Sequence, residues 1–152
     1  MNSATKEQII KKLGLEPLAD EGGYFRLMYR SPHASAIYYL VSPNDFSALH
    51  RLKGDEIFHF YAGDPVEMVQ ISDAGVLKKI SIGSDIMNGQ EPQVIAPAGV
   101  WQGTRLQDGG KWALLGTTMA PRYDVSEFEL GDRGKLLREF PKLTDTIMKY
   151  TR

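Results

Sequence analysis

Residues 50–64 read HRLKGDEIFHFYAGD, and their first ten positions hold two imidazoles, a guanidinium and two adjacent carboxylates. Aromatic and apolar residues fill the positions between these polar groups, and the segment ends at a Gly-Asp-Pro turn. This mixture is typical of a strand that presents polar side chains to a pocket. Imidazoles and carboxylates in a pocket can exchange protons with a ligand or coordinate a divalent metal.

His50 and Glu56 are the candidate catalytic pair. A carboxyl group among Leu, Phe and Trp side chains has its charged form disfavoured, which raises its pKa towards neutrality unless a cation compensates. One group would then act as base and the other as acid, as epimerisation or tautomerisation next to a carbonyl requires. The competing interpretation is that Arg51 or Arg105 holds Glu56 ionised in a structural ion pair.

Strand alternation assigns the other side chains of this segment to faces. Phe58 and Phe60 share the inner face with Glu56, whereas His59 faces the exterior or a partner subunit. Arg51 also points outward, and we expect it to be a structural or interface charge.

A barrel of this size encloses room for one small ligand. The candidates for substrate contact are one amide and five aromatic side chains: Gln102, Phe25, Tyr38, Phe58, Phe60 and Tyr123. Aromatic residues are equally what any β core needs, so core packing is the alternative role for each.

Many short strands must position these groups. Apolar, β-branched and aromatic runs separated by Gly, Pro, Asn and Asp predict about nine strands, at residues 24–30, 36–41, 46–52, 56–61, 66–72, 76–82, 93–96, 101–106 and 112–119. Their spacing of roughly 8–12 residues is typical of an all-β sandwich or barrel.

Helical segments are expected at both ends of the chain. Thr5 and Gln8 have the form of a capping box, an apolar stripe follows, and Gly14 ends the helix. We therefore expect residues 1–14 to form an N-terminal helix, 24–121 the barrel, and 122–152 a helical tail packed on it. No repeat or linker interrupts residues 1–152, so they are expected to form one domain.

Composition narrows the classes of function. The chain has 152 residues, 42% of them hydrophobic and 24% charged, a net charge of −1 and no cysteine. It is therefore globular, and nucleic acid and anionic membranes are poor partners. Disulfides, thiolate zinc sites and cysteine nucleophiles are excluded. The first residues lack the apolar run of a signal peptide, and no stretch is long enough to span a membrane, so we expect a cytoplasmic protein.

Residues 50–63 resemble the first motif of the cupin superfamily, which reads His-x-His, three or four residues, Glu, six residues, Gly. His50, Glu56 and Gly63 fit this motif, and Leu52 stands at the second His position. Residues 97–102, Pro-Ala-Gly-Val-Trp-Gln, resemble the second motif, Pro-x-Gly-x-x-His, with Gln102 at the His position.

The chain as a whole is similar to the cupin-5 family of unknown function. The matching segments follow in the expected order: 13–15, 21–25, 36–39, 50–52, 55–56, 59–64, 97–99, 101–102 and 119–121. The resemblance implies a cupin double-stranded β-helix, or jelly-roll barrel, usually paired as a homodimer and similar in fold to sugar-nucleotide epimerases and germin-like proteins. An outward row of Tyr39, Tyr61 and Trp101 supports the homodimer. No reaction is implied, because the fold hosts many.

The resemblance also implies a position for a divalent metal, at His50, Glu56 and Gln102. The replacement of two imidazoles by Leu52 and Gln102 removes most of the affinity for zinc, iron or copper. We therefore expect no cofactor, with a metal at these three residues as the alternative. In a further interpretation, Gln102 bridges His50 and Glu56 in a hydrogen-bonded network.

The leading functional hypothesis is an isomerase, epimerase or lyase that acts on a carbohydrate-like or other polar organic ligand. His50 and Glu56 would be its acid–base pair and Gln102 its orienting amide. The alternative is a protein that binds or senses a small metabolite without turnover. A third hypothesis, a metal-dependent oxygenase, is weakened by Leu52 and Gln102.

Overall fold

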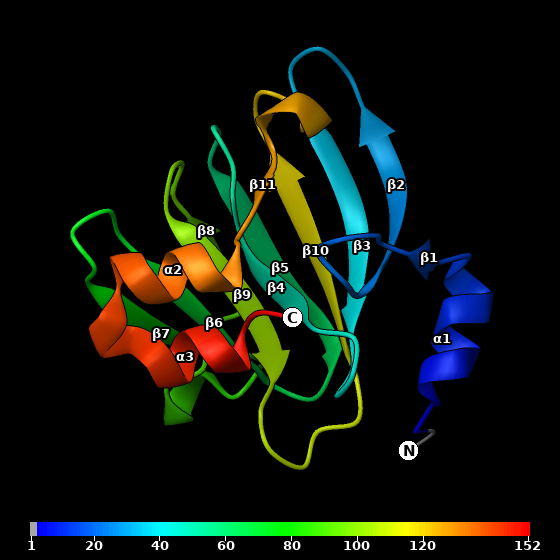
Figure 1. Ribbon diagram of the computed structural model, residues 1–152. Helices are drawn as coiled ribbons and strands as arrows, with labels where there is room; N and C mark the ends of the chain where they lie inside the picture. The colour runs from blue at the N-terminus through cyan, green and yellow to red at the C-terminus, as the bar shows by residue number, and fades with distance from the viewer. Residues whose placement is uncertain (1–2) are drawn as a thin grey trace.

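Two antiparallel sheets face each other in the computed structural model, which describes residues 3–152 (Figure 1). The strands of the described chain are β1 (Glu16–Pro17), β2 (Tyr24–Arg30), β3 (Ser35–Val41), β4 (Ser47–Arg51), β5 (Glu56–Gly63), β6 (Val66–Ile71), β7 (Leu77–Ile82), β8 (Gln93–Ala96), β9 (Trp101–Leu106), β10 (Ala113–Met119) and β11 (Glu129–Leu130). One sheet has the order β1-β2-β3-β10-β5-β8, and the other has the order β11-β4-β9-β6-β7. This is the expected jelly-roll barrel.

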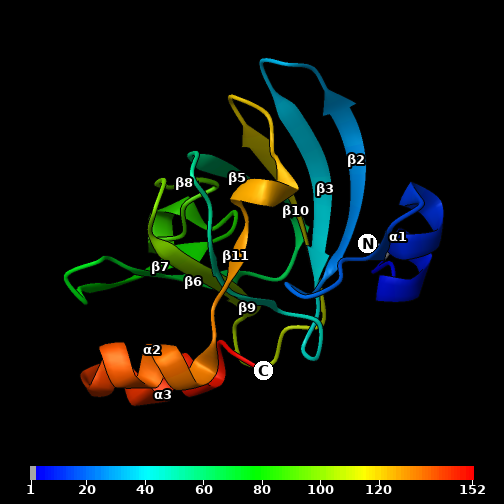
Figure 2. The same ribbon diagram turned by 45° about the horizontal axis from the view of Figure 1, so that its top comes forward.

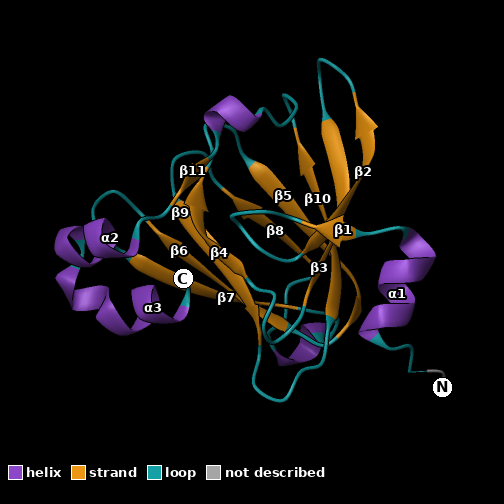
Figure 3. Ribbon diagram, turned by 45° about the vertical axis from the view of Figure 1, so that its right-hand side comes forward, coloured by secondary structure: helices purple, strands orange, loops and turns teal. Residues whose placement is uncertain are grey.

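The helices lie on the outer faces of the two sheets. They are α1 (Lys6–Leu13), α2 (Arg133–Glu139) and α3 (Thr144–Lys149), with 3₁₀ turns η1 (Ile86–Asn88), η2 (Val125–Glu127) and η3 (Pro141–Leu143). In Figure 3, α1 lies on one side of the strands, and α2 and α3 lie on the other. None of the helices within residues 3–152 has the length and apolar character needed to cross a membrane.

Helix α1 occupies residues 6–13 of the segment 1–14 that was expected to be helical; residues 1 and 2 lie outside the described residues, and the helix begins at the predicted capping box. The Thr5 hydroxyl accepts from the Gln8 amide at 3.2 Å, and the Gln8 side chain accepts from the Thr5 amide at 2.8 Å. Gly14 ends the helix with φ 66°, in the left-handed region that favours glycine. The apolar face of α1 packs on the outside of the six-stranded sheet, against Leu40 and Leu114.

The C-terminal helices cover the outside of the five-stranded sheet (Figure 2). Their apolar side chains form a core with residues of β4, β6 and β9: Leu136, Phe140, Ile147 and Tyr150 pack with Leu49, Val69, Ile71 and Trp101. The expected helical tail is confirmed from residue 133 onward. Residues 120–131 form no α-helix, because they cross the mouth of the barrel as the 3₁₀ turn η2 and as β11, which pairs with β4.

The space between the sheets is filled at one end and hollow at the other. Inward residues near the filled end, including Val41, Leu115 and Phe60, pack in the main core with residues of β6 and β7. Towards the other end the inward rows of β3, β5 and β10 line a cavity instead. Tyr39 and Phe58 belong to both the core and the cavity wall, so they form its floor.

The expected outward row of Tyr39, Tyr61 and Trp101 is wrong for Tyr39, and Trp101 faces outward but is covered by the helices. Tyr39 is 1% exposed and points between the sheets, and Trp101 is buried under the C-terminal helices. Tyr61 alone of the three is exposed, at 53%. The inward face of β3 could not be assigned from its sequence because both faces are apolar: α1 covers one and the barrel interior the other.

Candidate active site

A cavity of about 450 Å³ occupies the hollow end of the barrel. Its walls are largely hydrocarbon and aromatic, and they include Leu18, Phe25, Leu27, Ile37, Leu52, Phe58, Met119, Val125 and Phe128. Polar groups are few and come mainly from the β1–β2 loop and from the ends of β3, β5 and β10. An apolar pocket with a few convergent polar groups is the usual form of a small-molecule site.

Glu56 begins β5 and reaches the cavity with 9% of its surface exposed. Burial raises the pKa of its carboxyl group to about 7, and the nearby charge of Glu21 acts in the same direction. His50, Thr117 and Gln102 act in the opposite direction, because they favour the ionised form. Near neutral pH this carboxyl group therefore holds a proton about half of the time, as a group that both donates and accepts protons must.

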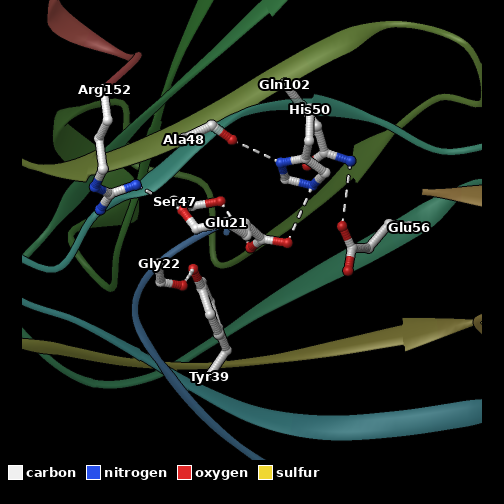
Figure 4. A network of polar contacts seen from close by, with 9 residues as sticks. All are labelled: Glu21, Gly22, Tyr39, Ser47, Ala48, His50, Glu56, Gln102 and Arg152. Atoms are coloured by element: carbon white, nitrogen blue, oxygen red, sulfur yellow. Dashed lines mark hydrogen bonds and ion pairs between the residues drawn. The ribbon is translucent and has the colours of Figure 1, made fainter. Parts of the chain in front are cut away.

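His50 lies on β4 behind the cavity wall, with 1% of its surface exposed. Its Nδ1 is 2.8 Å from the carbonyl oxygen of Ala48, so Nδ1 carries a proton and donates it to that oxygen. Its Nε2 is 3.5 Å from Oε1 of Glu21 (Figure 4). The ring stacks on Phe128, with centroids 5.4 Å apart. These contacts fix the ring and aim Nε2 at Glu21.

Glu21 is a site residue that sequence reasoning missed. It lines the cavity and takes a hydrogen bond from the Ser47 hydroxyl at 2.9 Å, in addition to its contact with His50. The sequence around it, Glu-Gly-Gly-Tyr-Phe, indicated only a turn and a family resemblance. A carboxylate directly before two glycines was the available signal, but nothing local shows that this turn folds into the barrel.

The loop that carries Glu21 is held from both sides (Figure 4). From inside the barrel, the Tyr39 hydroxyl donates to the carbonyl oxygen of Gly22. From outside, the Arg152 guanidinium donates to the carbonyl oxygens of Glu21 and Phe46, both at 2.9 Å. Gly22 has φ 99°, and a Cβ there would collide with the Phe46 carbonyl group and with Arg152. The loop therefore requires glycine and presents Glu21 rigidly.

Gln102 joins the site through one of its two amide atoms. Its Nε2 donates to Oε1 of Glu56 at 3.2 Å, and its Oε1 has no hydrogen-bond partner within the described chain. The expected bridge between His50 and Glu56 is therefore half formed, because His50 turns to Glu21 instead. His50 and Gln102 are opposite each other on β4 and β9, behind the cavity rather than on its surface.

The aromatic candidates divide into three groups. Phe25, Phe58 and Tyr123 line the cavity, with Tyr123 at its exposed mouth. Phe60 packs in the main core, beyond the floor of the cavity. Tyr38 differs from the prediction: it lies on the outer face of β3 near α1, and its neighbour Tyr39 takes the inner position.

No arginine neutralises Glu56 in the described chain. Arg51 pairs with Glu129 at 2.6 Å on the outer surface and covers the ring of Trp101. Arg105 stacks on Phe46 and donates to the carbonyl oxygen of Lys149. The interpretation of Glu56 as one half of a structural ion pair therefore does not describe this site. His59 faces outward, as expected, and is 3.0 Å from the Thr118 hydroxyl.

The donor set does not fit the metal site that the cupin motifs would imply. Leu52 presents hydrocarbon to the cavity, and Gln102 turns its amide nitrogen towards Glu56. Residues 3–152 hold no group of three or more His, Asp or Glu side chains arranged around a common ion position.

Fold and cavity together define a cupin-type jelly roll with a buried carboxyl group in its barrel. The sequence profile of Cupin_5, described as Cupin superfamily (DUF985), matches residues 7–131, and the chain belongs to this family. No curated protein matches the chain.

Solved structures show the same fold. A protein from Shewanella oneidensis is 31% identical with a TM-score of 0.93, and the match covers 98% of both chains. A hypothetical protein from Leishmania major is 27% identical with a TM-score of 0.92, over 97% of this chain and 99% of that one. Oxalate decarboxylase from Bacillus subtilis is 13% identical with a TM-score of 0.61; 90% of this chain matches 37% of the decarboxylase, and this likeness concerns the fold alone.

Proposed function

We propose that this protein is a small-molecule-binding cupin that carries out acid–base chemistry of the isomerase, epimerase or lyase type in its barrel. One observation carries the proposal: Glu56, at the wall of an apolar cavity, has a pKa of about 7. Enzymes raise the pKa of carboxyl groups towards neutrality by burial of this kind, because such a group both takes up and releases protons readily at the working pH.

Glu21 supplies the second proton-transfer group of the proposed site. Glu56 takes a proton from the substrate, and Glu21, which also lines the cavity, returns one. His50 acts through Glu21 rather than on the substrate, because its Nε2 faces Oε1 of Glu21 and its ring lies behind the wall. Since Nδ1 donates to the Ala48 carbonyl, Nε2 is the atom that exchanges a proton with Glu21. His50 is thus a positioning residue in this proposal.

Exchange with deuterated water tests the reaction even when the substrate is unidentified. Polar organic compounds are first screened for those that raise the melting temperature, and each binder is then incubated with the protein in D₂O and followed by proton NMR. We expect one C–H signal of a binder to be lost by exchange, about 10²–10⁴-fold more slowly with Glu56→Gln. Glu91→Gln, at an exposed site outside the cavity, is the matched control and should keep the rate.

A protein that binds or senses a metabolite without turnover is the second candidate. The predominance of apolar side chains in the cavity wall favours it, because such walls bind a ligand without contributing to a reaction. Binders that show neither exchange nor conversion, with affinities unchanged in Glu56→Gln, would establish this candidate and contradict the first.

We also propose that the protein is a homodimer in the cytoplasm, as the sequence predicts. Strand β2 supports the dimer: it pairs with β1 only at Tyr24 and Phe25, so the rest of one edge is free within the described chain. Leu27, Met28 and Tyr29 on this edge are each about half exposed. Light scattering should give twice the mass of one chain, and Met28→Lys should shift it to a single chain. A monomeric wild-type protein contradicts the proposal.

A further inference from the structure

The charged groups of the cavity are unevenly distributed along its depth. Glu21 and Glu56 lie on the inner wall, with little of either side chain exposed. Asp20 and Arg30 are exposed residues at the mouth, where water screens them. Among the described lining residues, the inner part of the cavity thus holds two carboxyl groups and no lysine or arginine.

The field of these carboxyl groups extends through the cavity. The charge of Glu21 adds to the effect of burial in raising the pKa of Glu56 at the inner wall. At the mouth, burial and the charges of Glu21 and Glu56 raise the pKa of Tyr123. An anion that enters this space meets like charge at low dielectric, whereas a cation is attracted along the whole path.

The apolar walls favour a ligand with a hydrocarbon or aromatic body. Phe25, Ile37 and Phe58 offer no hydrogen bonds through their side chains, so a uniformly polar ligand would lose its hydration there without replacement. Thr117, whose hydroxyl group can accept an N–H hydrogen bond, and Ser35, whose hydroxyl group already accepts one from the Tyr123 amide, also line the cavity. The site therefore combines an apolar body pocket with an acidic inner wall.

We propose that the cavity binds a small organic cation, with its apolar body against the walls and its ammonium group between Glu21 and Glu56. The inference rests on the proposed function only in taking this cavity as the ligand site, and it requires no turnover. Dicarboxylates and sugar nucleotides are anions and are disfavoured. The ligand therefore differs in charge from the oxalate named for the Bacillus subtilis neighbour, although the fold is shared.

Three inert probes of similar shape and different charge test the inference: 2-phenylethylamine, 2-phenylethanol and phenylacetate. Binding is measured by isothermal titration calorimetry at pH 8, where most Glu56 is ionised. We expect the amine to bind at least about tenfold more tightly than the alcohol, and the alcohol more tightly than phenylacetate. Phenylacetate binding as tightly as the amine overturns the proposal. Since no probe is converted, this result is independent of any catalytic activity.

Isosteric variants show which carboxyl groups produce the preference for the amine over the neutral and anionic probes. Glu21→Gln and Glu56→Gln should each weaken the amine about tenfold and leave 2-phenylethanol nearly unchanged. The control is Glu91→Gln, which changes the net charge equally at an exposed site away from the cavity and should alter none of the affinities. A preference for the amine that survives both cavity substitutions contradicts the proposal.

Proton release gives a further readout. An ammonium group beside Glu56 favours its carboxylate, so binding of the amine at pH 7 should release up to about half a proton. Titrations in buffers of different ionisation enthalpy measure this number. Release should disappear in Glu56→Gln and persist in Glu91→Gln. Proton uptake, or undiminished release in Glu56→Gln, counts against an ammonium at this position.

Discussion

Two hollows meet at the mouth of the barrel, and Phe128 and Leu52 line both of them. The inner hollow is the cavity with Glu21 and Glu56. The outer one is an open groove that carries both signs of charge, from Arg51, Lys53, Asp73, Glu127 and Glu129. Carboxyl groups therefore lie on both sides of a thin wall that consists of the Phe128 ring and the Leu52 side chain.

The same functional group behaves differently on the two sides. In the groove, Glu129 is about half exposed and pairs with Arg51, an arrangement that contributes at most about 0.5 kcal/mol to stability. In the cavity, Glu56 has no cationic arginine or lysine partner and a pKa of about 7. The comparison shows that enclosure by the fold, rather than the type of residue, prepares a carboxyl group for proton transfer.

Among the substitutions that test the contrast between cavity and groove, Glu56→Gln should change the stability most. The pKa of Glu56 is raised, so the folded protein holds a proton that the unfolded chain releases between about pH 4.5 and 7. Stability should therefore fall as pH rises through this window, by up to about 3 kcal/mol. Glu56→Gln should lose this fall and be the more stable protein at pH 8. Urea unfolding from pH 4 to pH 9 measures the difference.

Glu91→Gln is the control for this experiment, because its carboxyl group is exposed. It should keep the pH dependence of the wild-type protein. Parallel stability curves for wild type and Glu56→Gln would show that Glu56 has an ordinary pKa, and the contrast between the two hollows would then be lost.

Phe128→Ala should join the two hollows. The ring stacks on His50 and separates the cavity from the groove, so its removal admits water to Glu56. We expect a loss of about 2 kcal/mol, below the cost of a fully buried Phe because Phe128 is half-buried. The pKa of Glu56, followed by ¹³C NMR, should fall towards its usual value. Val125→Ala, also in the cavity wall but largely exposed, should leave that pKa in place.

Arg152→Ala should loosen the wall that carries Glu21. It removes hydrogen bonds to the carbonyl oxygens of Glu21 and Phe46 and the stacking of the guanidinium on the Phe46 ring. We expect a loss of about 1 kcal/mol and faster hydrogen exchange at the Gly22 amide, which bonds to the Leu18 carbonyl. The exposed Arg138→Ala carries the same charge change and should not affect this exchange. Equal exchange rates in both variants would mean that the other contacts of the loop, including those of Tyr39 and Ala48, hold it without Arg152.

Glu129→Gln should have the smallest effect. The ion pair with Arg51 lies at the surface, so its loss should cost at most about 0.5 kcal/mol, and salt at about 1 M should remove the difference from the wild-type protein. Chemical unfolding at low and at high salt measures the loss of stability and its dependence on salt. A loss above about 2 kcal/mol would mean that the groove isolates its charges as the cavity does.

Local patterns in the chain were sufficient for much of the fold. Alternation placed Phe58 and Phe60 on the inner face with Glu56, and the capping box placed the start of α1. Both patterns act between residues near in sequence, so they are visible in a short segment of the chain. The rise in the pKa of Glu56 was also a prediction, because alternation places it on the same face as the apolar Phe58 and Phe60.

Strand β3 shows where such reasoning fails. Tyr38 and Tyr39 are adjacent and chemically identical, and only the packing of α1 on one face of the sheet decides which of them reaches the cavity. Residues 120–131 show the same limit. Tyr123 was predicted as a ligand contact, but the sequence does not indicate that the rest of the segment crosses the barrel mouth as η2 and β11, where Phe128 meets His50.

The sequence by itself determined nine of the described strands, the N-terminal helix, the family and Glu56 as a candidate carboxyl group inside the barrel, since these follow from local periodicity and motif spacing. The two-residue strands β1 and β11 were not predicted, because they form only through pairing with β2 and β4. The tertiary structure alone decided the partners of that carboxyl group. Gln102 reaches Glu56 from 46 residues away, and Arg152 holds the Glu21 loop from 131 residues away. Such contacts depend on how distant segments close the barrel, and their distances set the desolvation and charge interactions that control proton transfer.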